Sequence, residues 1–151
     1  MLSNVEAPVL TIRACELHDV DAVTSLMHEV RYPATPGVMR ERIQMSQTSE
    51  KACMLVAEVD KVVVGLLGLQ CIQSHASRNQ ATQITSLIVR HSHRGAGIGR
   101  RLLELAESWA REHGSEKLLI IEGNRDEHKS SYPFYEHIGF IKHGYRFSKS
   151  L

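Results

Sequence analysis

The sequence predicts an α/β fold in which a mixed β-sheet is covered by helices. The apolar stretches alternate in type along the chain, in the order β-α-α-β-β-β-α-β-α-β. A strongly amphipathic helix also connects the fourth expected strand to the fifth, between Ala81 and Ile121, and such a strand–helix–strand unit forms a right-handed parallel crossover. At 151 residues, the chain has the length of one domain with a sizeable core.

The first half of the chain is expected to contain three strands and two helices. Both helices have apolar residues at helical spacing, and the second begins with threonine followed by proline, a common helix start. The last two of these strands are joined by a short turn and pair naturally. The expected elements are a strand over Val9–Ala14, a helix over Asp19–Val30, a helix from Thr35 to about Gln47, and strands over Lys51–Glu58 and Val62–Ile72.

The second half is expected to begin with a polar loop from Ser74 to Asn79. Its long helix has apolar residues on one face and charged residues on the other, and Gly114 is the expected left-handed stop. The next strand is uniformly apolar, as in strands buried on both faces. The expected elements are a strand over Ala81–Val89, a helix from Ile98, a strand over Lys117–Ile121, a short helix over Tyr132–Ile138 that ends at Gly139, and a last strand over Phe140–Phe147.

Composition and charge exclude several classes of protein. The formal net charge of +1 argues against a nucleic-acid partner. No apolar run is long enough to span a membrane, and the N-terminus does not resemble a signal peptide, so we expect a cytoplasmic protein with no membrane partner. Cys15, Cys53 and Cys71 form no C-x-x-C pair, which favours a reduced cytosolic setting. Without a linker or repeat, we expect one domain over 9–151 after a short extension, 1–8.

The most informative segment is a glycine-rich turn between the fourth expected strand and the long helix. From Val89 to Arg100 it reads VRHSHRGAGIGR. Glycines let the backbone approach a ligand closely. The unpaired N–H groups of the first helical turn, together with the helix dipole, favour an anion such as a phosphate. A plain helix start with flexible glycines would also give this pattern.

The spacing of the glycines distinguishes three phosphate-binding motifs. A nucleotide P-loop needs lysine and then serine or threonine after its last glycine, where this chain has Arg100 and Arg101. A dinucleotide fingerprint needs a third glycine at the place of Arg100. The remaining pattern, R-x-x-G-x-G, is met by Arg94, Gly97 and Gly99. That pattern resembles the pyrophosphate-binding motif of the GNAT family of N-acetyltransferases.

A second segment strengthens this resemblance. Residues 131–140 read SYPFYEHIGF, which is similar to the closing motif A-x-x-F-Y-x-x-x-G-F of that family. In family members the tyrosine at the place of Tyr135 often serves as a general acid. A tyrosine hydroxyl has an ordinary pKa of about 10 and can protonate a departing thiolate if it lies beside the sulfur. Phe134 is expected in the core, as is Trp109 on the apolar stripe of its helix.

The resemblance implies a particular sheet and a way of holding acetyl-CoA. In the GNAT fold the sheet is mixed and mostly antiparallel, and its fourth and fifth strands splay apart, so that the pantetheine arm pairs with the main chain of the fourth. The family often has asparagine where this chain has His128, and Asn124 is a candidate to replace it. The residues implied to bind the cofactor are Leu87, Ile88, Val89, Arg94, Gly95, Ala96, Gly97, Ile98, Gly99, Arg100, Asn124, His128 and Ser131.

The general base is less clearly indicated. Many relatives use a glutamate on the fourth strand, but this chain has no carboxylate between Gln83 and Leu87. Glu122, after the fifth expected strand, is the candidate base, and a water relay is the alternative. His91 and His93 form a close pair without a third ligand at useful spacing, so no metal is expected.

These features together imply an N-acetyltransferase. It would transfer the acetyl group of acetyl-CoA directly to the primary amine of a small molecule in a ternary complex, without a metal. Two alternatives remain: an acetyltransferase of protein N-termini or lysines, and a non-catalytic acyl-CoA sensor, which the absence of an obvious base would fit. Dimers are common among relatives, so a homodimer is a further expectation by analogy.

Overall fold

The computed structural model describes residues 9–73, 78–121, 132–142 and 147–151. The chain divides into two compact units, Met1–Ile120 and Ile121–Leu151. The first unit contains a sheet and three long helices, and the second contains one short helix. Within the described ranges, no helix has both the length and the apolar character needed to cross a membrane.

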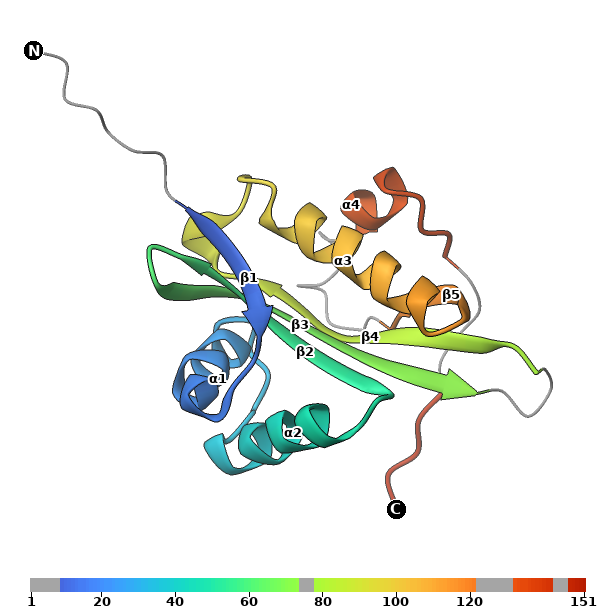
Figure 1. Cartoon of the computed structure of the whole chain (residues 1–151), viewed down its shortest axis with the longest axis horizontal. Coiled ribbons are helices and arrows are strands. Elements are labelled where there is room, and N and C mark those ends of the chain that lie inside the picture. Colours follow the sequence, from blue (N-terminus) through green and yellow to red (C-terminus); the bar gives the residue numbers. More distant parts are fainter. Residues whose placement is uncertain (1–8, 74–77, 122–131, 143–146) are drawn as a thin grey trace, which may run out of the picture. The chain divides into compact units, whose positions relative to one another are not determined.

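The first unit is built on a five-stranded sheet whose strands lie in sequence order, β1-β2-β3-β4-β5. Neighbouring strands are antiparallel except for β4 and β5, which are parallel and are connected through helix α3 (Ile98–Glu112), as Figure 1 shows. The predicted mixed sheet and its parallel crossover are confirmed. The strands are β1 (Leu10–Ala14), β2 (Ala52–Val59), β3 (Val62–Gln73), β4 (Gln80–Val89) and β5 (Ser115–Ile120).

Helices cover both faces of this sheet. Helices α1 (Val20–Glu29) and α2 (Pro36–Thr48) lie on one face and α3 lies on the other (Figure 1). The start of α2 is the predicted one, because the Thr35 hydroxyl accepts a hydrogen bond of 3.2 Å from the Val38 N–H. The core between α1, α2 and the sheet includes Val23, Leu26, Ile43, Val56, Leu66 and Ile88.

A partly buried ion pair ties the first strand to the residue that precedes the first helix. The Arg13 guanidinium donates to both carboxylate oxygens of Asp19, at 2.7 and 2.8 Å, and to Glu58 on β2, at 2.5 Å. The Asp19 side chain is 3% exposed. Hydrogen bonds from Arg13 hold the pKa of the Asp19 carboxyl below its ordinary value. The pair therefore fixes where α1 leaves the sheet.

Two strand predictions differ from the structure. Strand β5 begins at Ser115 and not at Lys117. The Ser115 hydroxyl lies 2.7 Å from the hydroxyl of the buried Thr82, so the start of the strand provides a hydrogen-bond partner for that buried polar group. Part of the expected last strand, residues 143–146, lies outside the described residues. Its described ends, 140–142 and Phe147, belong to no strand.

In the second unit, the predicted short helix is confirmed as α4 (Tyr132–His137). It ends just before Gly139, which has a positive φ of 101° that glycine adopts without strain.

Candidate cofactor site

The pairing of β4 with β5 stops where β4 has a β-bulge against β3. Their pairing ends at Ile84 and Ile120, whereas β4 continues to Val89. On the other side of β4, the register with β3 shifts at this place, so that Thr85 is the extra residue of the bulge. Beyond the bulge, this edge of β4 has no strand partner among the described residues. The open edge of β4 that the GNAT resemblance implies is therefore present in the described part of the chain, while the residues that follow Ile121 on the side of β5 lie outside it.

Beyond the bulge, the main-chain N–H and C=O groups of β4 point alternately toward β3 and toward the open edge. The Arg90 N–H donates to the Val64 carbonyl on β3 at 2.7 Å, and alternate residues of a strand point their main-chain groups the same way. The main chain of Ile88 therefore faces β3, and its side chain is 5% exposed in the core. Leu87 and Val89 are the members of the expected set whose main-chain groups face the open edge.

The glycine-rich turn leads directly from this edge into α3. Gly95 and Gly97 have positive φ angles of 81° and 84°, and Gly97 is the N-cap residue. The Arg101 N–H donates to the Gly97 carbonyl at 3.1 Å and closes the first helical turn, and no side chain caps the helix. The N–H groups of the three residues after Gly97 thus precede the first intrahelical bond, where a helix favours an anion.

Arginines surround this helix start. Arg94 and Arg100 are exposed, and Arg101 forms an exposed pair with Glu104 at 3.3 Å. The Arg94 Nε donates to the Val89 carbonyl at 3.2 Å, which ties the turn to the end of β4. The first helical residue, Ile98, is buried and anchors the helix in the core. The turn therefore presents positive charge and main-chain N–H donors, and its position is held by the contacts of Arg94 with β4 and of Ile98 with the core.

A carboxylate from another helix also supports the turn. Glu29, the last residue of α1, accepts a hydrogen bond of 2.5 Å from the His91 N–H and pairs with Arg90 Nη1 at 3.3 Å. Sequence reasoning missed this residue. The available signal was weak: an acidic residue in the last turn of a helix is disfavoured by the helix dipole, so it often has a partner elsewhere.

The second unit presents the expected general acid on α4. The Tyr135 ring meets the Phe140 ring edge to face, with ring centroids 5.9 Å apart, and its carbonyl accepts from the Phe140 N–H at 2.9 Å. The prediction that Phe134 is buried is wrong, because it is 39% exposed. A helix of six residues offers its neighbours too narrow a face to bury two adjacent aromatic side chains.

Several expected site residues belong to the segment between β5 and α4. Glu122, Asn124, His128 and Ser131 lie outside the described residues. His91 and His93 lie in a short 3₁₀ turn before Arg94. Within the part of the chain that the structure describes, no three His, Cys, Asp or Glu side chains are grouped closely enough to hold a metal ion.

Known proteins resemble this chain in sequence or in fold. The human N-acetyltransferase 8 is 30% identical over 106 residues, which cover 70% of this chain and 46% of that protein, so the chain spans less than half of that relative. An acetyltransferase from Trypanosoma brucei has a similar structure, with a TM-score of 0.76, 22% identity and coverage of 95% of this chain and 100% of that one. An aminoglycoside N-acetyltransferase solved with CoA has a TM-score of 0.82, 13% identity and 97% coverage of both chains.

The family itself is shown by a match over most of the chain. The model of the acetyltransferase (GNAT) family matches residues 20–140, which include both helices before β2, the whole sheet from β2 to β5, and the glycine-rich turn. This match agrees with both sequence motifs and with the open edge of β4. The chain therefore belongs to the GNAT family of acetyltransferases.

Proposed function

We propose that this protein transfers the acetyl group of acetyl-CoA to the primary amine of a small molecule, by direct transfer in a ternary complex. One observation supports this most strongly: the uncapped start of α3 lies next to the open edge of β4. Main-chain donors for a diphosphate and a free strand edge for an extended amide arm are thus adjacent.

The chain's own groups would hold the cofactor as follows. The N–H groups of Ile98, Gly99 and Arg100 receive the diphosphate, and the exposed side chains of Arg94 and Arg100 add charge. The main-chain groups of Leu87 and Val89 pair with the pantetheine arm. The backbone conformation fits this use, because the positive φ of Gly97 turns the chain so that the next N–H groups are presented together.

The chemistry breaks one C–S bond and forms one C–N bond. The neutral amine attacks the thioester carbonyl, and main-chain N–H groups beyond the bulge stabilise the oxyanion. As the intermediate collapses, the thiolate departs and takes the proton of the Tyr135 hydroxyl. The proton of the amine passes to Glu122 or to water, which leaves an amide and free CoA.

Both acceptor classes occur among the structural matches, since an aminoglycoside N-acetyltransferase covers 97% of this chain and a ribosomal-protein-alanine N-acetyltransferase covers 95% of it, so the test includes both. The test is thiol release from acetyl-CoA with a panel of polyamines, aminoglycosides and amino acids, beside peptides with free N-termini or lysines. Turnover with the small amines supports the proposal. Turnover with the peptides alone would show that the acceptor is a protein. Cofactor binding without turnover on any amine would identify a non-catalytic acyl-CoA sensor.

A further inference from the structure

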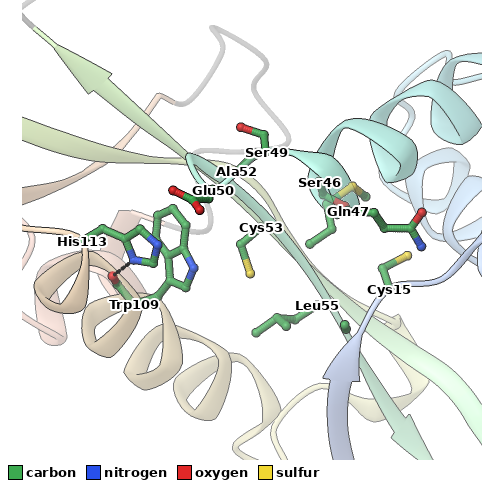
Figure 2. A pocket seen from close by; sticks show the side chains of 12 residues that line it. Cys15, Ser46, Gln47, Ser49, Glu50, Ala52, Cys53, Leu55, Trp109 and His113 are labelled. Atoms are coloured by element: carbon green, nitrogen blue, oxygen red, sulfur yellow. Dashed lines mark hydrogen bonds between the residues drawn. The ribbon is translucent and has the colours of Figure 1, made fainter.

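A pocket lies at the end of α3 opposite the glycine-rich turn. Strand β1 stops at Ala14, which pairs with Leu55, whereas β2 begins three residues earlier, at Ala52. This exposes an edge of β2 between the last turns of α2 and α3 (Figure 2). The pocket has a volume of about 410 Å³ and is lined by Ala14, Cys15, Ser46, Gln47, Ser49, Glu50, Ala52, Cys53, Met54, Leu55, Trp109 and His113.

An aromatic pair forms one wall of this pocket. The Trp109 and His113 rings stack with centroids 3.8 Å apart, and the His113 Nδ1 lies 2.8 Å from the Trp109 carbonyl, which fixes the imidazole. The prediction that Trp109 is buried in the core is wrong: it is half-buried and lines the pocket.

The floor is apolar and chemically inert. Leu55 and Cys53 come from β2, and Cys15 lies where the chain leaves β1. Burial raises the pKa of the Cys53 thiol, and it raises that of Cys15 to about 12. Both cysteines are therefore protonated at neutral pH and behave as small hydrophobic side chains, not as nucleophiles.

The electrostatics of the rim favour a cation. Figure 2 shows the Glu50 carboxylate beside Trp109 and His113. The pocket also lies between the C-terminal ends of α2 and α3, where helix dipoles concentrate negative charge. The last turn of α2 has no basic residue, and Arg111 in the last turn of α3 pairs with Glu107 and does not line the pocket. In the described part of the chain, neither lysine nor arginine lines the pocket.

We propose that this pocket binds a small organic cation, an amine or quaternary ammonium with a compact apolar body. The aromatic wall attracts the cation through its π face, Glu50 provides the opposite charge, and the floor covers the apolar body. The site is separate from the glycine-rich turn, because the 15 residues of α3 extend over about 22 Å. The proposal does not depend on acetyl transfer.

The test uses the single tryptophan of the chain as a reporter. Benzyltrimethylammonium is titrated into the protein without acetyl-CoA, and Trp109 fluorescence and the indole N–H resonance are followed. This cation has no N–H and cannot be an acetyl acceptor. We expect a saturable change at both signals, with weaker binding of benzyl alcohol and of benzoate. Equal or tighter binding of the neutral or anionic probe, or no saturation, overturns the proposal.

Charge and location are tested separately. Glu50→Gln should raise Kd about fivefold, the effect of one exposed carboxylate near a cation. The matched control is Glu41→Gln on α2, which is exposed and does not line the pocket, and it should leave Kd unchanged. Saturation with CoA should also leave Kd unchanged. Equal effects of the two variants, or displacement of the probe by CoA, would refute a separate cation site.

Discussion

The Glu29 carboxylate at the end of α1 accepts a hydrogen bond of 2.5 Å from the main-chain N–H of His91, 62 residues further along the chain. The same carboxylate pairs with Arg90. Helix α1 thereby holds the first residues of the turn that leads to the uncapped start of α3. If that start binds a diphosphate, Glu29 positions the binding groups without contacting the ligand.

Loss of Glu29 should weaken cofactor binding. We expect Glu29→Ala to raise the KM for acetyl-CoA about tenfold with a smaller effect on kcat, because a hydrogen bond to a charged group is lost and the turn is released. Glu29→Gln keeps an acceptor oxygen and should recover part of the loss. The control is Asp21→Asn, exposed on the same helix. An unchanged KM for Glu29→Ala would remove the positioning role.

Gly97→Ala should also weaken cofactor binding. A side chain at a φ of 84° is strained by about 1–2 kcal/mol, so the turn must change its conformation. We expect the Kd for CoA, measured by calorimetry, to rise about tenfold. Gly37→Ala is the matched control, because Gly37 lies inside α2 with no backbone strain and no close contact. Equal affinity of both variants would show that the site has been misplaced.

Tyr135→Phe tests the proposed general acid. The Phe140 contact involves the ring, so the packing should persist, while kcat falls about a hundredfold because the leaving thiolate receives no proton. The Kd for CoA should remain close to that of the wild type. A kcat equal to the wild-type value would assign proton donation to another group.

Asp19→Asn should destabilise the fold by about 1–2 kcal/mol at pH 7, since it removes one of the two carboxylates that pair with the partly exposed Arg13. Because the folded-state pKa of Asp19 is lowered, its contribution is complete above the unfolded-state value of about 4 and disappears as the pH falls through the lower, folded-state value. Urea unfolding at pH 7 and below pH 3 measures this. The difference between variant and wild type should shrink in acid, whereas a pH-independent difference would contradict the assignment.

Gly68→Ala should disturb the bulge. An added Cβ would lie 2.5 Å from Thr85 Oγ1, so we expect a loss of about 1–3 kcal/mol of stability. In Gly68→Ala/Thr85→Ala the nearest remaining atom is 3.4 Å away, and most of the loss should be recovered. Chemical denaturation of the two single variants and the double variant measures this coupling. Additive effects would show that the two residues do not constrain each other.

Local patterns predicted most of the fold and part of the site. The face of α3, the start of α2 and the turn at Gly97 depend on neighbouring residues, so the sequence reveals them. The partner of Glu29 lies 62 residues away, and the bulge at Thr85 depends on Gly68 of the neighbouring strand. Contacts between residues far apart in the sequence can be identified only when the pairing of the strands is known. Helical periodicity likewise places Trp109 on the apolar face of α3, but it does not show that this part of the face lines an open pocket with residues of α2 and β2.

The bulge directs the side chains of Ile84 and Ile88 to opposite faces of the sheet. Side chains alternate along a strand, so Ile84 and Ile88, four residues apart, would face the same way on a regular strand. The extra residue reverses the alternation between them. Ile88 pairs with Leu66 and joins the cluster beneath α1 and α2, whereas Ile84 pairs with Leu69 and lies outside that cluster. Removing Thr85 would therefore not shorten a loop; it would turn one of two buried isoleucines away from its hydrophobic layer.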